Sequence, residues 1–449
     1  MTFQDFKLNK FLLSALEELG ISEPTTIQEK TFTSILSGKD VVGIAQTGTG
    51  KTFAFLLPLL RNWKFTKSPF PQILIMVPTR ELVAQVVTEI EKLTKYMNFV
   101  SVGVYGGTNM RGQKEAISEG VDAVVGTPGR LMDLMKDGVL KTKLIKHLVI
   151  DEVDEMLNLG FRVQLQSVVD FLPEKRQNLM FSATMIPEVE KIIVEFTDFY
   201  EKIEAAPSGA PLKNILQQAY KVANFNTKAN LLELLLDSEE RISKALVFVG
   251  TKKYANALFE RMEEKYGEKV SVIHSSKSQN NRFEAVNKFQ SGEVRFLINT
   301  DIIARGLDVF GVTHVINFDL PDNPEKYIHR IGRTGRAEEK GIAISFISEK
   351  DEKIQEQIEA LMDQKIELLE SPEELVISDE LIELEKVVVH VPFDNHKVKT
   401  FTPSGPAFHE KKAKNKKVNV RKSRADKMKE KYKKPLTRGQ KSRKRKKKH

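Results

Sequence analysis

Residues 45–52 of the chain read AQTGTGKT, a glycine-rich segment that ends in Gly-Lys-Thr. It follows a short apolar run, VVGIA (41–45), and precedes a helical pattern, TFAFLLPLL (52–60). A strand, a glycine-rich loop and a helix in this order turn backbone N–H groups toward phosphate at a helix N-terminus. The segment matches the phosphate-loop pattern Gly-x-x-x-x-Gly-Lys-Ser/Thr, except that Ala45 stands at the first glycine position. The alternative is a glycine-rich turn without a ligand.

Short apolar runs alternate with longer helical patterns through most of the chain, which predicts βα units around mainly parallel sheets. The pattern breaks at AAPSGAPLKN (205–214), whose prolines, glycine and small residues are typical of a linker. We therefore expect an α/β fold with two similar domains. The expected strands are 41–45, 72–78, 100–106, 122–128, 147–151 and 178–184, then 244–251, 269–275, 294–301, 312–319 and 341–348.

The net charge of +9 is unevenly distributed along the 449 residues. Residues 410–449 hold 21 Lys/Arg and 3 Asp/Glu, a net charge of +18, which leaves 49 basic and 58 acidic residues and a net charge of −9 elsewhere. Residues 366–385 hold eight acidic residues and no basic one. The basic tail lacks apolar periodicity, so we expect it to be disordered in isolation and to bind nucleic acid; the alternative is a solubilising tail.

A phosphate loop needs a carboxylate that positions a metal ion, and DEVD (151–154) follows the apolar run LVI. Lys51 would contact the β and γ phosphates, and Thr52 and Asp151 would hold Mg²⁺, Asp151 through the hydration shell of the ion. Glu152 is the candidate to polarise the attacking water. The alternative for an acidic run after a strand is a capped helix start.

Together these segments resemble the DEAD-box RNA helicases of superfamily 2, with a bacterial RhlE-like type as the expected subgroup. The resemblance covers roughly residues 3 to 350 and implies two RecA-like domains. The motifs that carry it, in order, are GISEPTTIQ (20–28), AQTGTGKT (45–52), PTRELVAQ (78–85), GG (106–107), TPGR (127–130), DEVD (151–154), SAT (182–184), VFVGT (247–251), TDIIARGLD (300–308) and HRIGRTGR (329–336).

The resemblance implies roles for further residues of the ATP site. Gln28 and Phe3 would recognise adenine by amide pairing and ring stacking, although Phe3 could instead be an N-terminal core anchor. Asp308 would contact the ribose, and the arginine fingers Arg333 and Arg336 would complete the site from the second domain. The full set of expected ATP-binding residues is Phe3, Gln28, Ala45, Gln46, Thr47, Gly48, Thr49, Gly50, Lys51, Thr52 and Asp308.

The same resemblance implies an RNA-binding face and a coupling relay. Strand ends with short polar side chains and glycines suit contacts to phosphates and 2′-hydroxyl groups, which carry little sequence specificity. Asp154, Ser182 and Thr184 would couple hydrolysis to RNA handling. The expected RNA-binding residues are Thr79, Arg80, Gly107, Thr127, Arg130, Gln279, Arg282 and Thr300.

Three positions depart from the family pattern, because Val153, Ser275 and Ile303 stand where Ala, Gly and Ala are usual. The charged residues around them are intact. Additional methyl groups in tight sites cost about 1–3 kcal/mol unless neighbouring side chains shrink.

We interpret the chain as an RNA-stimulated ATPase with ATP and Mg²⁺ as cofactors. ATP and RNA would close the two domains, and closure would unwind a short duplex locally. One alternative is an ATP-gated RNA clamp or assembly scaffold, and another is a DNA translocase. We expect a cytoplasmic monomer without a membrane segment, with RNA and ribosomal or RNA-decay proteins as partners. The expected division is a domain at 1–205, a linker at 206–213, a domain at 214–365, an acidic connector at 366–409 and the tail at 410–449.

Overall fold

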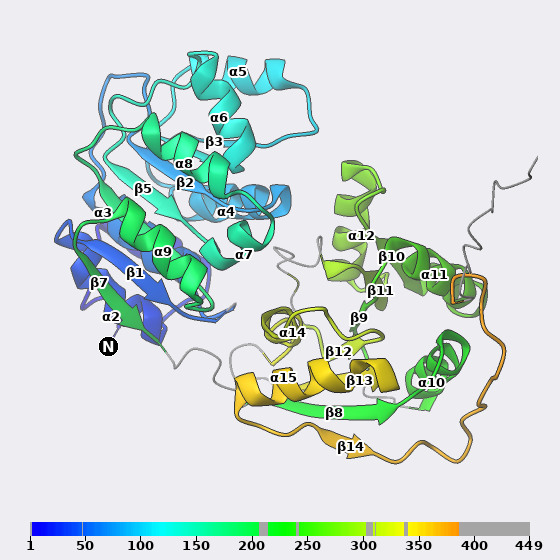
Figure 1. Cartoon of the computed structure of the whole chain (residues 1–449). Helices are drawn as coiled ribbons and strands as arrows, with labels where there is room; N and C mark the ends of the chain where they lie inside the picture. Colours follow the sequence, from blue (N-terminus) through cyan, green and yellow to red (C-terminus); the bar gives the residue numbers. More distant parts are fainter. Residues whose placement is uncertain are drawn as a thin grey trace, which may run out of the picture. The chain divides into compact units, whose positions relative to one another are not determined.

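The computed structural model describes residues 2–46, 48–205, 214–238, 242–301, 309, 311–335 and 340–385. Two parallel sheets organise this part of the chain, each with helices packed on its faces (Figure 1). The expected fold class, two tandem α/β domains with parallel sheets, is confirmed. Thr47, the linker at 206–213, Asp308, Arg336 and the basic tail lie outside the described residues.

The first sheet has seven strands, and all of its pairings are parallel. Five of the central strands are almost wholly buried because their side chains face helices on both sides. In spatial order the strands are β3 (Ser101–Val104), β4 (Ala123–Gly126), β2 (Ile73–Met76), β5 (His147–Ile150), β6 (Gln177–Ser182), β1 (Asp40–Ile44) and β7 (Tyr200–Glu204).

Two hydrophobic cores lie on opposite faces of this sheet, because alternate residues of a strand point in opposite directions. Val41 packs in one core, and its neighbour Val42 packs in the other. The first core holds side chains of α1 (Lys10–Glu18), α2 (Thr26–Leu36), α3 (Lys51–Asn62) and α4 (Arg80–Leu93). The second holds side chains of α5 (Met110–Ser118), α6 (Pro128–Lys136), α7 (Val153–Asn158), α8 (Arg162–Asp170) and α9 (Pro187–Phe196).

The second sheet repeats this architecture, with parallel pairing throughout. Its strands in spatial order are β10 (Val270–Ile273), β11 (Phe296–Asn299), β9 (Ala245–Phe248), β12 (His314–Asn317), β13 (Gly341–Ile347), β8 (Ile215–Lys221) and β14 (Glu367–Leu369). Its helices are α10 (Phe225–Ser238), α11 (Lys252–Tyr266), α12 (Gln279–Ser291), α14 (Pro324–Ile331) and α15 (Glu352–Met362), with short 3₁₀ turns η1 (Gly267–Lys269) and η2 (Glu349–Asp351).

Residues 366–385, the acidic segment, are bonded to the second domain by strand pairing and hydrogen bonds. β14 pairs with β8, and the amides of Asn224, Asn226 and Asn230 donate hydrogen bonds to carbonyls of the following segment. The Glu385 carboxylate accepts a hydrogen bond from the backbone N–H of Phe225 at 2.8 Å. The first half of the expected connector is therefore packed against α10, while the boundary at 365 stays a prediction.

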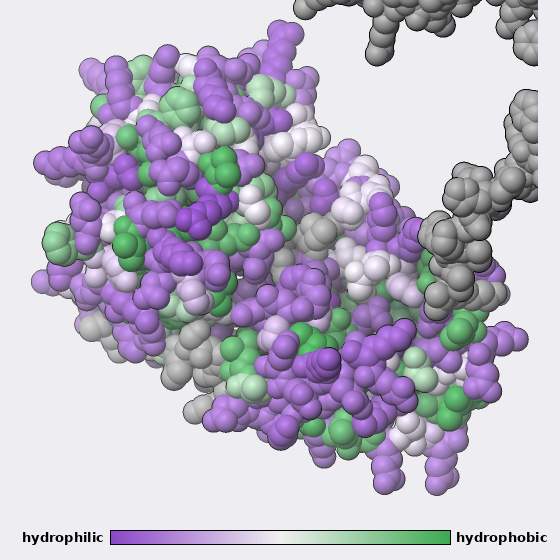
Figure 2. Space-filling view, viewed as in Figure 1, coloured by the Kyte–Doolittle hydropathy of each residue, from purple (hydrophilic) through white to green (hydrophobic). Residues whose placement is uncertain are grey.

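The surface drawn in Figure 2 is mainly hydrophilic, and its hydrophobic atoms form separate patches. Several large apolar side chains are exposed, among them Phe65, Val194 and Phe199. Among the described residues, no helix combines the length and the apolar character needed to cross a lipid bilayer.

The contact between β1 and β6 generates a stability prediction. A Cβ added at Gly43 would lie 2.5 Å from Cε1 of Phe181, whose ring is fully buried. Gly43→Ala should destabilise the first domain by about 1–3 kcal/mol, because the ring has no free volume into which it can move. Gly112→Ala is the matched control: it lies in α5 with open space at the Cβ position, and it should be neutral or stabilising by up to about 1 kcal/mol. Urea unfolding of both variants measures the difference, and equal midpoints would contradict this packing.

Candidate functional site

The expected site residues lie at the carboxyl edge of the first sheet. The phosphate loop follows β1, Asp151 follows β5, and Ser182 ends β6. These three strands are neighbours in the sheet. The expected RNA-binding motifs follow β2, β4 and β3, which form the other side of the same sheet. The strand order thus places the ATP motifs side by side and the RNA motifs next to them.

The phosphate loop is held by its two glycines and by Gln28. Gly48 and Gly50 have φ values of 82° and 85°, a region that side chains with a Cβ rarely adopt. The Gln28 Nε2 donates to the carbonyl of Gly50 at 3.1 Å, and its Oε1 accepts from the backbone N–H of Thr25 at 3.0 Å. The expected adenine-recognising residue is therefore also bonded to the phosphate loop.

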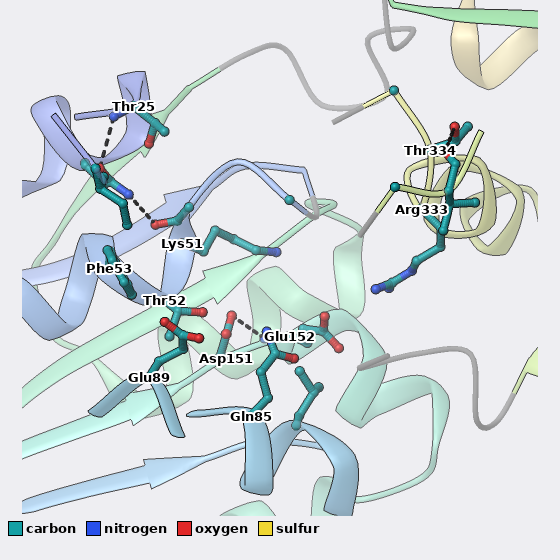
Figure 3. A pocket seen from close by; sticks show the side chains of 18 of the residues that line it. Thr25, Lys51, Thr52, Phe53, Gln85, Glu89, Asp151, Glu152, Arg333 and Thr334 are labelled. Carbon is teal, nitrogen blue, oxygen red and sulfur yellow. Dashed lines mark hydrogen bonds between the residues drawn. The ribbon is translucent and has the colours of Figure 1, made fainter. Parts of the chain in front are cut away.

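Lys51 begins α3, and its side chain is only 7% exposed. Within the described residues its Nζ has no hydrogen-bond partner. A buried ammonium without a partner is costly, so its geometry fits an anionic ligand. Figure 3 shows Thr52, Asp151 and Glu152 around this side chain, with the Arg333 guanidinium directed toward the same space.

These side chains line a cavity of about 520 Å³, a volume typical of nucleotide-sized ligands. Eight of the expected catalytic and ATP-binding residues contribute to its wall: Gln28, Gly48, Gly50, Lys51, Thr52, Asp151, Glu152 and Arg333. The sequence interpretation did not assign a role in the ATP site to the other lining residues, several of which lie in its motifs: Ile21, Glu23, Thr25, Phe53, Leu82, Gln85, Glu89, Gly311, Val312, Thr334 and Gly335.

Burial shapes the electrostatics of the acidic motif. Burial raises the pKa of Asp151, although the nearby Lys51 ammonium opposes the shift. Burial also raises the pKa of Glu152 to about 6, with Lys51 and Arg333 opposing and Asp151 reinforcing the rise. Glu152 adopts left-handed backbone angles, with φ 53° and ψ 52°, which places it at the start of α7. A carboxylate with a pKa near neutrality is suited to accept a proton at physiological pH.

Asp154 connects the acidic motif to the SAT segment. Its Oδ2 accepts hydrogen bonds from the Thr184 hydroxyl and backbone N–H, both at 3.0 Å, and from the Ala183 N–H at 3.2 Å. His329 Nε2 lies 3.8 Å from the same oxygen. Burial would raise the pKa of Asp154, but His329, Lys51 and the hydrogen bonds from Thr184 outweigh it and keep the pKa below its ordinary value. The Ser182 hydroxyl donates to the Thr184 carbonyl at 2.7 Å.

Expected RNA-binding residues of the first domain gather where β2, β3 and β4 end. Thr79 caps α4 by accepting a hydrogen bond from the Leu82 N–H at 3.3 Å. A Cβ at Gly107 would lie 2.3 Å from the Arg80 Nη1, so this glycine allows the guanidinium to lie against the backbone. Arg130 donates to Gln113 Oε1 at 2.8 Å and to the Thr108 carbonyl at 3.3 Å. Thr127 is the N-cap residue of α6.

The second-domain residues of this set follow β10 and β11. Thr300 follows β11 and is buried. Gln279 Nε2 and Arg282 Nη1 both donate to Oε1 of Glu81, at 3.1 and 2.8 Å. Glu81 belongs to the PTRE motif and was not among the predicted residues. The Glu81 carboxylate forms an ion pair with the guanidinium of Arg282. A charged donor offsets the cost of burying this carboxylate.

Arg330 was also missed, although its motif HRIGRTGR was recognised. Its guanidinium donates to both carboxylate oxygens of Asp301, at 2.5 and 2.8 Å, and to Oδ1 of Asn317 at 3.0 Å. The side chain lies over the Phe248 ring, with 4.9 Å from Cζ to the centroid. The bidentate pair joins the start of TDIIARGLD to HRIGRTGR. A basic residue inside an otherwise assigned motif was the only signal in the sequence.

Other expected residues lie away from the cavity or outside the described residues. Phe3 is 4% exposed and contacts Phe6 edge-on at 5.6 Å between centroids, as the core-anchor alternative requires, so its adenine contact stays a prediction. Ala45, Gln46 and Thr49 support the loop without lining the cavity: the Ala45 N–H donates to the Ser182 carbonyl, and the Thr49 hydroxyl donates to the Gln46 carbonyl.

Two of the three departures from the family pattern can be placed. Val153 is fully buried in the second core of the first domain, and Ser275 is exposed. Ile303 lies outside the described residues, as do Thr47, Asp308 and Arg336.

Comparison with known proteins adds family evidence. A family model described as DEAD/DEAH box helicase matches residues 25–192, and one described as helicase conserved C-terminal domain matches residues 226–338. The chain is 37% identical to the ATP-dependent RNA helicase DbpA of Bacillus subtilis over 372 residues, which are 82% of this chain and 76% of the relative. It is also 37% identical to the DEAD-box ATP-dependent RNA helicase CshA of Geobacillus kaustophilus over 396 residues, which are 88% and 84% of the two chains.

Solved structures of the same architecture also match. S. cerevisiae Dbp5 bound to RNA and ADP BeF3 matches with a TM-score of 0.75 and 29% identity, over 82% of this chain and 95% of that chain. Mss116p bound to ssRNA and AMP-PNP matches with a TM-score of 0.74 and 28% identity, over 83% and 79% of the two chains. The RhlE-like subgroup is not tested by these similarities and stays a prediction. The matched models, the identities and the cavity built around Lys51 together establish that the chain belongs to the DEAD-box ATP-dependent RNA helicases.

Proposed function

We propose that ATP and RNA binding close the two domains of this helicase on RNA, that closure bends one strand and opens a short duplex, and that hydrolysis resets the open state. The observation that carries the proposal is the Lys51 ammonium, which is buried without a hydrogen-bond partner in the described residues and lies in a cavity lined by both domains. The triphosphate of ATP would supply its missing partner. Because Arg333 lines the same cavity, movement of the second domain would change the charge around the γ phosphate.

Residues of both domains would share the chemistry. Lys51 would hold the β and γ phosphates, Glu152 would accept a proton from the attacking water, and Arg333 with Arg336 would stabilise charge on the transferring phosphoryl group. Gln28 would pair with adenine while it stays bonded to the phosphate loop. The hydrogen bonds between Asp154 and Thr184 would carry changes at the γ phosphate toward the RNA-binding edge.

The residues present also fit a magnesium ion. Thr52 and Asp151 line the cavity beside Lys51 and would hold Mg²⁺, whose charge would neutralise the phosphates during transfer. Among the described residues no group of three or more His, Asp or Glu side chains could bind a metal alone. This matches the usual magnesium site, in which one or two carboxylates act together with substrate phosphates.

RNA would bind along the ends of β2, β3 and β4, where Thr79, Arg80, Gly107, Thr127 and Arg130 gather. Gln279, Arg282 and Thr300 would add contacts from the second domain. In the described structure Glu81 occupies the donors of Gln279 and Arg282, so RNA phosphates would have to compete with this carboxylate. Glu81 belongs to α4, and other residues of this helix line the ATP cavity. A nucleotide that moves α4 would therefore change how strongly Glu81 competes with RNA.

The first prediction from the proposed function concerns the arginine finger. Arg333→Ala should lower RNA-stimulated ATP turnover by about 10³-fold or more while leaving ATP affinity within severalfold of wild type, because a finger acts on the transition state. Lys340→Ala, an exposed cation of the same domain, is the control and should keep full turnover. Steady-state phosphate release measures both variants. Unchanged turnover in Arg333→Ala would refute its role.

The second prediction follows from the pKa of Glu152. A carboxylate whose pKa is raised to about 6 is protonated below that pH and cannot act as a base there. We expect kcat/KM for ATP to fall as the pH drops through about 6 and to level off above it, with a tenfold loss for each pH unit below the pKa. Glu152→Gln should reduce turnover by about 10²-fold or more and abolish this limb, whereas the exposed Glu119→Gln should change neither. A wild-type profile that is flat between pH 5 and 7 would contradict the assignment.

The third prediction concerns the basic tail, which lies outside the described residues. Deleting residues 410–449 removes a net charge of +18, so it should weaken RNA affinity and flatten the dependence of affinity on salt. Basal ATPase should stay unchanged because every described residue that lines the cavity belongs to one of the two domains. RNA titrations at several salt concentrations test this, and an unaltered salt slope would show that the tail is only solubilising.

A further inference from the structure

An exposed aromatic surface on the first domain takes no part in the proposed ATP and RNA sites. The ring of Trp63 contacts Phe65 and Phe99 in edge-on geometry, with centroids 6.4 and 5.2 Å apart. Phe65 is 60% exposed and Val100 is 46% exposed. We call Trp63, Phe65, Phe99 and Val100 the aromatic patch. Exposed large apolar side chains that cluster are less common than scattered ones and mark interaction sites.

The patch lies at the edge of the sheet opposite the phosphate loop. α3 begins at the phosphate loop and ends at Asn62, directly before Trp63. Phe99 and Val100 precede β3, whereas the expected RNA-binding glycine Gly107 follows it. The 12 residues of α3 span about 18 Å, so the two ends of this helix are about that far apart. Neither ATP nor RNA at the carboxyl edge would cover the patch.

Lys64 and Lys67 bring two positive charges to the patch against the single negative charge of Asp122, which its hydrogen bonds do not remove. Both oxygens of the Asp122 carboxylate are occupied: Oδ1 accepts from Trp63 Nε1 at 3.2 Å, and Oδ2 accepts from the Val100 N–H at 3.0 Å. Lys64 and Lys67 flank Phe65 in the sequence and are exposed, and neither forms an ion pair with another described residue. Residues 63–70, WKFTKSPF, thus alternate aromatic rings with cations that have no carboxylate partner.

We propose that the aromatic patch is an accessory binding surface for single-stranded RNA, separate from the groove at the carboxyl edge. Phe65, supported by Trp63, stacks on an unpaired base, and Lys64 and Lys67 contact the adjoining phosphates. Every base offers a face for stacking, so the site accepts many sequences. An apolar protein partner would bury the two ammonium groups without supplying carboxylates, and the loss of their hydration would cost free energy. RNA instead supplies a phosphate for each ammonium group. The proposal goes beyond the motor function because it requires neither ATP nor domain closure.

Trp63 provides a direct test, because it is the only tryptophan in the chain. A short single-stranded oligoribonucleotide is titrated into the full-length protein without nucleotide, and the tryptophan fluorescence is recorded together with RNA anisotropy. We expect base stacking to quench the fluorescence. Phe65→Ala should weaken the binding reported by quenching about five- to tenfold. The double variant Lys64→Gln with Lys67→Gln should reduce the salt slope by about one for each lysine.

Phe199→Ala is the matched control, because Phe199 is an exposed phenylalanine of the same domain, 91% accessible and outside the patch. It should bind RNA as wild type does, and all variants should keep basal ATPase. The proposal is overturned if RNA binds without changing Trp63 fluorescence and Phe65→Ala binds as tightly as wild type. It is also overturned if a photocrosslinker at position 65 captures a protein and no RNA in cells. If the protein shows this quenching but has no ATPase activity, the proposed ATPase mechanism fails and the accessory RNA site stands.

Discussion

The charge balance around the Lys51 ammonium is the constraint on which the ATP site depends. A cation that is 7% exposed and has no hydrogen-bond partner among the described residues lies beside the carboxyl groups of Asp151, which is buried, and Glu152, which is partly buried. Burying such groups costs free energy that the two hydrophobic cores of the domain must offset. The phosphate loop, the left-handed glycines and the bond from Gln28 hold the ammonium in place. A bound polyphosphate would supply the anionic partner that the buried Lys51 ammonium lacks among the described residues.

The order of strands explains how one sheet can serve two ligands. ATP motifs follow β1, β6 and β5, and RNA motifs follow β2, β4 and β3. Helix α4 belongs to both sets: Thr79, Arg80 and Glu81 stand at its start, whereas Leu82, Gln85 and Glu89 line the ATP cavity. A small shift of this helix would change the contacts of its residues with both ATP and RNA. This shared helix gives the proposed coupling a physical path that adds to the Asp154–Thr184 hydrogen bonds.

The sequence predicted the strands with continuous apolar runs and missed three strands of mixed composition at one side of the two sheets. All eleven expected strands correspond to strands of the two sheets, because buried parallel strands form continuous apolar runs. The structure adds β7, β8 and β14, which are the last strands at one side of each sheet. Their sequences YEKIE, ILQQAYK and ELL mix polar and apolar residues, since one face or edge is open to solvent. Pairing with a neighbour decides their conformation, and local sequence does not encode that.

For the site, the phosphate-loop and acidic motifs identified Lys51 and Glu152, and the family resemblance added Arg333. The sequence interpretation missed residues whose role depends on a partner distant in sequence. Glu81 lies about 200 residues from Arg282, and Arg330 reaches Asp301 through the fold. It also could not decide that Phe3 is buried against Phe6. Contacts between residues this far apart in the sequence depend on the tertiary fold, so motifs in the sequence alone do not predict them.

Single-turnover ATP hydrolysis, measured with and without saturating RNA, tests whether RNA controls completion of the ATP site. If the ATP site is completed only when the second domain supplies Arg333 and Arg336, RNA should raise the rate of the chemical step itself. An identical single-turnover rate with and without RNA would mean that RNA is not needed to bring Arg333 and Arg336 to the phosphate, and would contradict the proposed control of hydrolysis by RNA.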